Sequence, residues 1–207
     1  MPGKQSLIDR GHMNKVKYLL TYGYAEIIHD LTVEFTKKYI LGDLSSLSSL
    51  GIGRKPDYRQ ADQMNQAARS GKQNIVEGIC QGLTSDKGVI KLLGVANASF
   101  EELLTDYEDF LRQNKLEIFS KDEKQTAEFR GIAYKISNLS NLSSLGEFIE
   151  KPKLFGNPQD DANYLLTLCH LETYLLSKQI KATEEKFIKS GGYNENLYNK
   201  RRDYRKY

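Results

Sequence analysis

The sequence predicts an all-α protein: an antiparallel, up-down four-helix bundle with a C-terminal helical extension. Apolar residues recur every three or four positions along several long segments, which is the spacing of one helix face. No segment alternates apolar and polar residues over the length of a strand, and only four prolines interrupt 207 residues. Helices joined by short turns favour antiparallel neighbours. We place the bundle at 13–149 and the extension, a helix with a basic, tyrosine-rich tail, at 157–207.

The first helix is expected from Met13 to Leu41, with Gly42 as its stop. Its apolar stripe has helical spacing, and tyrosines widen it. The stripe comprises Val16, Leu20, Gly23, Ile27, Leu31 and Phe35, and the tyrosines are Tyr18, Tyr22, Tyr24 and Tyr39.

A leucine- and serine-rich octet follows this helix and nearly recurs later. Residues 44–51 and 139–146 differ only where Ser46 is replaced by Asn141. One interpretation is insertion of low-complexity sequence into loops, which accept added length at small cost. The other is a docking element that uses its leucines.

The second helix, expected over 57–81, is the element around which the bundle is organised. Asp57 can cap its start, because Gln60 follows at the spacing of a capping box, and Gly82 is the expected stop. Its small and apolar residues share one face, so a neighbouring helix can approach closely. The face comprises Met64, Ala67, Ala68, Gly71, Ile75, Gly78 and Ile79.

Three further helices complete the predicted fold. Thr84, Ser85 and Asp86 cap a third helix that runs to about Asn114, and the capping box of residues 120–123 opens a fourth. Asn157 and Pro158 begin a fifth, which runs to about Ser190 and ends at Gly191-Gly192. Asp160 and Asp161 lie in its first turn, where the helix dipole favours negative charge. We expect the fifth helix to pack outside the bundle or to reach a neighbouring subunit.

The sequence offers no support for a metal site or a cofactor. The three histidines, His12, His29 and His170, have no paired-cysteine, His-Glu-x-x-His or EF-hand spacing around them. Gly51-Ile52-Gly53 lacks the rest of a phosphate loop.

Candidate catalytic residues are equally few, so we predict that the protein is not an enzyme. No histidine stands at a spacing from Ser70 or Cys80 that would indicate a nucleophile paired with its general base. Glu77 lacks a second acid or base, and we interpret it as a buried or interfacial hydrogen-bond partner. Cys80 and Cys169 are expected to be buried thiols in a reducing compartment, and a disulfide between them is the alternative.

Five carboxylates cluster in the third helix, without the Glu-x-x-His pairs that a di-iron bundle requires. We interpret them as a solvated acidic face, with a surface that meets a basic patch of another subunit as the alternative. They are Glu101, Glu102, Asp106, Glu108 and Asp109.

The net charge of +3 lies entirely in the tail, because residues 193–207 hold five basic and two acidic side chains and the rest holds 25 of each. Cations beside aromatic rings suit phosphate contact and base stacking, and a solvated face with a disordered tail is the alternative. The candidate nucleic-acid-binding residues are Arg54, Lys55, Arg59, Arg69 and Lys72 near the second helix, and Lys200, Arg201, Arg202, Arg205 and Lys206 beside Tyr193, Tyr198, Tyr204 and Tyr207 in the tail.

The run from Gln66 to Gly78, with Ala67-Ala68, Asn74-Ile75 and Glu77-Gly78, resembles the second-helix signature of a family of bacterial four-helix-bundle proteins. That family includes proteins encoded by intervening sequences of large-subunit ribosomal RNA genes and the accessory protein of diversity-generating retroelements. The resemblance covers roughly residues 15–150. The C-terminal part, with Gly191-Gly192-Tyr193 and Arg201-Arg202, resembles the suffix segment of a subset of the family.

The resemblance implies a homopentameric barrel, and it implies RNA or DNA and a reverse transcriptase as candidate partners. We therefore expect a non-enzymatic, homo-oligomeric nucleic-acid-binding accessory protein. The alternative is a protein–protein interaction scaffold that does not bind nucleic acid, which the neutral balance of charge over 1–192 favours. No apolar run has the length of a membrane span, and no signal-peptide core is present, so we expect a cytoplasmic protein with no membrane partner.

Overall fold

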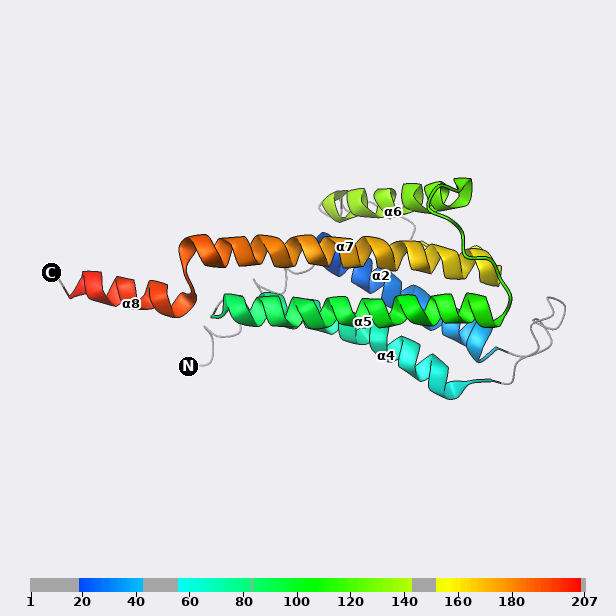
Figure 1. Ribbon diagram of the computed structural model, residues 1–207, viewed down its shortest axis with the longest axis horizontal. Coiled ribbons are helices and arrows are strands. Elements are labelled where there is room, and N and C mark those ends of the chain that lie inside the picture. The colour runs from blue at the N-terminus through cyan, green and yellow to red at the C-terminus, as the bar shows by residue number, and fades with distance from the viewer. Residues whose placement is uncertain (1–18, 43–55, 83, 143–151, 206–207) are drawn as a thin grey trace.

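The computed structural model describes residues 19–42, 56–82, 84–142 and 152–205, with side chains of α6 described as far as Lys135. These residues contain helices and turns but no strand, so the predicted all-α class is confirmed. Residues 44–51 and the second half of the other octet, 143–146, lie outside the described residues. In chain order the elements of Figure 1 are α2 (Leu20–Phe35), the π-helical turn η1 (Thr36–Ile40), α4 (Tyr58–Gln81), α5 (Asp86–Gln113), α6 (Lys124–Leu142), α7 (Pro158–Ser190) and α8 (Tyr193–Tyr204).

The helix starts follow from local side-chain caps that the sequence predicts. The Gln60 N–H donates to the Asp57 carboxylate at 2.9 Å, and the Gly88 N–H donates to the Ser85 hydroxyl at 3.0 Å. Asn157 caps α7 in the same way. Each cap satisfies an N–H that has no partner within its own helix, so the starts of α4, α5 and α7 are confirmed.

The small face of α4 packs against α5 of the same chain. A Cβ atom placed on Gly71 would lie 2.6 Å from the Phe100 ring, and one on Gly78 would lie 3.3 Å from the Leu92 Cβ. Phe100 is fully buried and cannot move aside without disturbing the core. Glycine at position 71 is therefore what allows the two helices to approach, which confirms the predicted crowding.

The largest difference from the sequence-based expectation concerns α6 and α7. The first half of α7 lies inside the core, in contact with α5, α2 and α6, and every residue from 161 to 169 is buried. The expectation that this helix packs outside the bundle is wrong, and the core extends across the expected boundary near residue 150. The reason is that six of the nine buried residues 161–169 are apolar (162, 164–166, 168 and 169), whereas the described part of α6 buries only Thr126, Phe129 and Ala133.

The π-helical turn η1 directs Tyr39 into this core. The Tyr39 hydroxyl donates to the Asp161 carboxylate at 2.6 Å, which joins the end of α2 to the start of α7. Phe35 packs edge-on against Tyr107 and Phe110, with ring centroids 5.2 and 4.9 Å apart. This aromatic cluster holds α2 against α5.

One expectation about α4 is wrong, because Cys80 is exposed rather than buried. Glu77 is exposed in the single chain as well, which excludes a buried role and leaves an interfacial role as a prediction. The two residues lie three positions apart and thus share a helix face, which points away from the face that carries Gly71 and Gly78. Cys169 is buried and its neighbour His170 is exposed, as the 100° turn between adjacent helical residues predicts. In the described part of the chain, no helix is long and apolar enough to cross a membrane.

Candidate nucleic-acid interface

Helix α8 stands apart from the rest of the molecule. None of its residues is buried, and Figure 1 shows it projecting beyond the end of α7, at the end of the molecule opposite η1. An isolated helix of this length gains little stability on its own in water. Its side chains are therefore available to an external partner along most of its length.

A glycine corner joins α8 to α7. Gly191 has φ 70° and ψ 170°, a conformation that is essentially restricted to glycine. The Gly192 N–H donates to the Glu195 carboxylate at 3.0 Å, and the Asn196 amide donates to the Gly191 carbonyl at 3.5 Å. These contacts set the direction in which α8 leaves α7.

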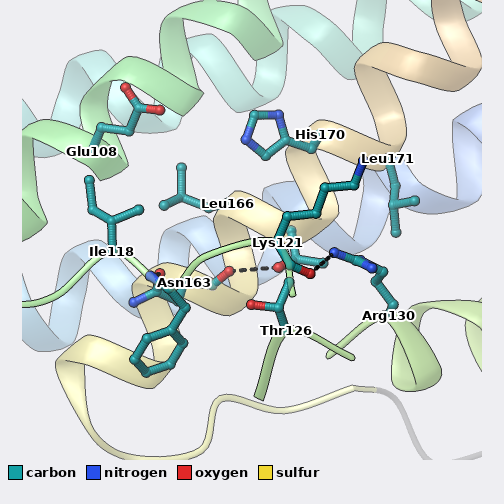
Figure 2. A pocket seen from close by; sticks show the side chains of 11 residues that line it. Glu108, Ile118, Lys121, Thr126, Arg130, Asn163, Leu166, His170 and Leu171 are labelled. Atoms are coloured by element: carbon teal, nitrogen blue, oxygen red, sulfur yellow. Dashed lines mark hydrogen bonds between the residues drawn. The ribbon is translucent and has the colours of Figure 1, made fainter. Parts of the chain in front are cut away.

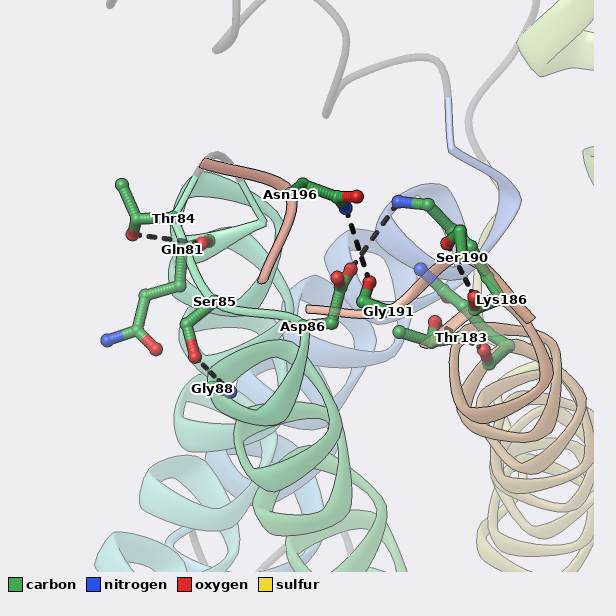
Figure 3. Close-up of polar contacts among 11 residues, drawn as sticks. Gln81, Thr84, Ser85, Asp86, Gly88, Thr183, Lys186, Ser190, Gly191 and Asn196 are labelled. Carbon is green, nitrogen blue, oxygen red and sulfur yellow. Dashed lines mark hydrogen bonds and ion pairs between the residues drawn. The ribbon is translucent and has the colours of Figure 1, made fainter. Parts of the chain in front are cut away.

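The corner is attached to the start of α5, as Figure 3 shows. Lys186 of α7 and Asp86 of α5 form an ion pair at 3.4 Å. The Lys87 ammonium lies 5.8 Å from the centre of the Phe187 ring. A Cβ atom on Gly192 would lie 2.9 Å from that ring, so the chain turns closely around Phe187.

Three arginines share one face of α8 with a tyrosine. Tyr198, Arg201, Arg202 and Arg205 follow at intervals of three or four residues and line one shallow groove. All four are exposed, and 67% of the Tyr198 surface is accessible to solvent. Among the described residues, Arg202 forms an ion pair with Asp203 at 3.6 Å. Both side chains are largely exposed, so the pair adds little stability.

This arrangement suits a nucleic-acid strand. Each guanidinium can donate two parallel hydrogen bonds to phosphate oxygens, and an exposed aromatic ring can stack on an unpaired base. Of the predicted tail residues, the structure brings together Arg201, Arg202 and Arg205. Lys200 is exposed on α8 but does not line the groove, and Lys206 lies outside the described residues.

The basic residues of α4 form no comparable cluster. Arg59 and Arg69 are exposed, but ten residues of helix place them about 15 Å apart. Lys72 is half-buried, with its ammonium 3.2 Å from the His29 ring. Burial and the neighbouring Lys72 lower the pKa of His29, so the histidine is held neutral beside the lysine. Arg54 and Lys55 lie outside the described residues.

The acidic residues of α5 restrict where a nucleic acid can bind. Glu101, Glu102 and Glu108 are exposed, as expected, and Asp106 is half-buried. Burial, and then the charges of Glu102 and Asp109, raise the pKa of Asp106 to about 6. A phosphate backbone would be repelled from this face.

Two buried carboxyl groups were not identified as such from the sequence. Asp161 was assigned to the helix dipole, yet it is fully buried and accepts hydrogen bonds from Tyr39 and from the N–H groups of Phe155 and Gly156. Burial raises its pKa, and these hydrogen bonds oppose the rise. Asp161 therefore fixes the segment that leads into α7.

Glu172 is the second buried carboxyl group. It is fully buried, and neither of its oxygens has a hydrogen-bond partner among the residues that the structure describes. Burial raises its pKa well above the usual value, so the neutral acid is favoured in the folded protein. Its position between Cys169 and Leu176 on the buried stripe of α7 is the signal that could have identified it from the sequence.

Among the residues that the structure describes, no group of three or more His, Cys, Asp or Glu side chains could hold a metal ion. No protein-family model matches the chain, and no curated protein or solved structure does either.

Proposed function

We propose that the protein is a non-enzymatic, homo-oligomeric nucleic-acid-binding accessory protein that contacts its ligand through α8. The observation that carries the proposal is the exposed face on which Arg201, Arg202 and Arg205 surround Tyr198. The net positive charge of the chain lies in the segment that carries this face, and the acidic face of α5 lies elsewhere.

We propose an antiparallel four-helix bundle of α2, α4, α5 and α7 as the scaffold, with α6 covering α2 and α7. Contacts between neighbouring helices support it, because early residues of one helix meet late residues of the next. The contacts are Thr36–Asn65 and His29–Lys72 between α2 and α4, Gly78–Leu92 and Gly71–Phe100 between α4 and α5, and Thr21–Gln179 and Tyr39–Asp161 between α2 and α7.

The oligomer is proposed from the family resemblance, which implies a pentamer and a reverse transcriptase as a further partner. The small face of α4 is already covered by α5 of the same chain, so subunits would meet through other surfaces. Large apolar side chains are exposed on four helices: Tyr58, Val95, Tyr134 and Tyr174. Light scattering should report about five times the chain mass of 23.6 kDa. A monomer at micromolar concentration would refute the ring.

The test of nucleic-acid binding is its dependence on salt. Each neutralised phosphate contributes a slope of roughly 0.7 for single strands and 0.9 for duplex in log affinity against log salt. We expect the triple change of Arg201, Arg202 and Arg205 to Gln to weaken binding and to lower the slope by roughly 2 for a single strand. The matched control changes the exposed lysines Lys91, Lys124 and Lys135 of α5 and α6 to Gln and should leave the slope unchanged.

The role of Tyr198 is tested separately. Because stacking requires exposed bases, Tyr198→Leu should weaken binding of a single strand more than binding of a duplex. If the arginine variant keeps the affinity and the slope of the wild type, α8 is not the contact, and Arg59 and Arg69 become the residues to change. If the wild type does not bind at low salt, nucleic-acid binding is refuted.

The second candidate function is a protein-interaction scaffold, and the acidic face of α5 favours it. Burial, and then repulsion from Glu102 and Asp109, raise the pKa of Asp106. A cationic protein surface would offset the repulsive part. Changing Glu102 and Asp106 to Gln and Asn would abolish such an interaction and would leave binding of nucleic acid through α8 intact.

A further inference from the structure

A cavity of about 360 Å³ lies between the 115–123 segment, α6, α7 and the end of α5. Figure 2 shows side chains from all four of these parts converging on it. It opens beside residues 163–171 of α7, whereas α8 extends from the far end of that helix (Figure 1). Nothing in the proposed nucleic-acid function uses it.

One wall of the cavity is fixed by a buried asparagine. Asn163 is 3% exposed; its carbonyl oxygen accepts from the Phe119 N–H at 2.8 Å, and its amide donates to the Glu117 and Gln159 carbonyls, each at 2.9 Å. The Thr126 hydroxyl also donates to the Ser120 carbonyl at 2.8 Å. These bonds hold the 117–120 segment against α7, so the cavity exists without a ligand.

The interior of the cavity is largely apolar. The lining includes Leu166, Leu171 and Phe119. Ile118 also lines the cavity, and 49% of its surface is exposed to solvent. The buried polar side chains of the wall, Asn163, Thr126 and Thr167, already have hydrogen-bond partners. A ligand that entered the cavity would therefore gain mainly from burial of its own apolar surface.

Cations lie at the mouth of the cavity. Lys121, Arg130 and His170 line it with a single carboxylate, Glu108, and all four are exposed. Neither Lys121 nor Arg130 forms an ion pair with another described residue. The Arg130 guanidinium donates to the Lys121 carbonyl, which orients it and leaves further N–H donors for an anion.

We propose that this cavity binds a small amphipathic organic anion, with its apolar body against Leu166 and Ile118 and its carboxylate beside Lys121 and Arg130. The volume falls within the range of ligand pockets in proteins, about 300–1,000 Å³. The apolar interior disfavours a small, fully hydrated anion such as inorganic phosphate, and the unpaired cations disfavour an amine.

The test is equilibrium dialysis of the full-length protein against labelled octanoate, with octylamine and inorganic phosphate as comparison ligands. We expect saturable uptake of one octanoate per chain and weaker binding of the other two. Changing Lys121 and Arg130 together to Gln should weaken octanoate binding about tenfold, since two charge interactions at an exposed rim are lost. The control changes Lys124 and Lys135 of α6 to Gln and should have no effect.

A second pair of variants tests the apolar part. Ile118→Asp should weaken octanoate binding at least tenfold, whereas Ile188→Asp, at an exposed position on α7, should not. Melting temperatures identify any variant that fails to fold. The proposal is overturned if octanoate does not saturate, if octylamine binds as tightly, or if the folded Lys121/Arg130 variant binds like the wild type. Binding of nucleic acid by α8 is unaffected by any of these outcomes.

Discussion

The two halves of α7 differ sharply although they form one continuous helix. Residues 161–169 are buried on every side, and Leu168 has no exposed surface. From Ser177 to Ser190 no residue is buried, and Ile188 leaves 79% of its surface exposed. Helix α8 continues the exposed part after the glycine corner.

The difference separates the residues that maintain the fold from those that are free to serve a partner. Burial of apolar surface stabilises the first half. The second half and α8 bury little and are dominated by charged and polar side chains, whose substitution is nearly neutral for stability. Substitutions near the start of the 47-residue stretch 158–204 should therefore change stability, and substitutions near its end should change ligand binding.

The most sensitive test compares two apolar residues of α7. Leu168→Ala should lower the free energy of unfolding by about 2–5 kcal/mol, because it leaves a cavity in the core. Ile188→Ala should change it by less than about 0.5 kcal/mol. Chemical denaturation of both variants measures the contrast, and equal losses would mean that the end of α7 is covered by a subunit or another segment.

A second comparison uses one buried and one exposed aspartate. Asp161→Ala leaves the N–H groups of Phe155 and Gly156 and the Tyr39 hydroxyl without their acceptor. We expect a loss of about 1–3 kcal/mol in denaturation experiments. Asp203→Ala removes only the exposed pair with Arg202 and should cost less than about 1 kcal/mol. A near-neutral Asp161→Ala would show that the α7 lead-in does not depend on this carboxylate.

The third comparison concerns two glutamates of α7. Glu172 is buried and has no hydrogen-bond partner in the described part of the chain, whereas Glu184 is exposed. Glu172→Met removes an unpaired buried carboxyl group and should stabilise the protein by about 1–3 kcal/mol at pH 8. Glu184→Met should have almost no effect.

The gain from Glu172→Met should depend on pH in a defined direction. The folded pKa of Glu172 is raised above its usual 4.5, so in the wild type the folded state holds this proton more tightly than the unfolded chain. Wild-type stability contributed by this group is complete below pH 4.5 and is lost as pH rises towards the folded pKa. The difference in melting temperature between variant and wild type should thus grow from pH 4.5 to pH 8. A constant difference would mean that Glu172 ionises normally.

Local signals in the sequence predicted much of the fold. The caps at Asp57, Ser85 and Asn157 and the close-packed face around Gly71 depend on neighbours within one helical turn or on the size of one side chain. Such features are encoded where they occur. The exposed tail was likewise predicted from its charge, and the structure adds that three of its arginines share a face with Tyr198.

The position of α7 could not be predicted in this way. Which amphipathic helix joins a core is decided by competition between helices for the same surface, and the stripe of α6 did not show that α7 would bury more. The cavity beside Asn163 combines residues from four parts of the chain, so no local pattern indicates it. The exposure of Cys80 could have been predicted: Gly78 lies on the packed face of α4, and Cys80 follows it by two residues, or about 200° around the helix.

The smallest effect on stability is expected at the corner between the two regions. Gly191→Ala places a Cβ atom 2.5 Å from the Glu195 carboxylate and strains a backbone with φ 70°. In a packed region such strain costs about 1–3 kcal/mol. Here α8 buries no residue, so the chain can relieve the strain by redirecting α8, and the melting temperature should change little.

The redirection can be measured by distances between spin labels at the native, exposed Cys80 and at Tyr204→Cys, since Cys169 is buried and unreactive. Gly94→Ala, at an open position on α5, is the control and should leave the distance distribution unchanged. A shifted distribution at constant melting temperature would show that α8 is oriented by this one residue. An unchanged distribution, or a large drop in melting temperature, would show that α8 is held by the body of the protein.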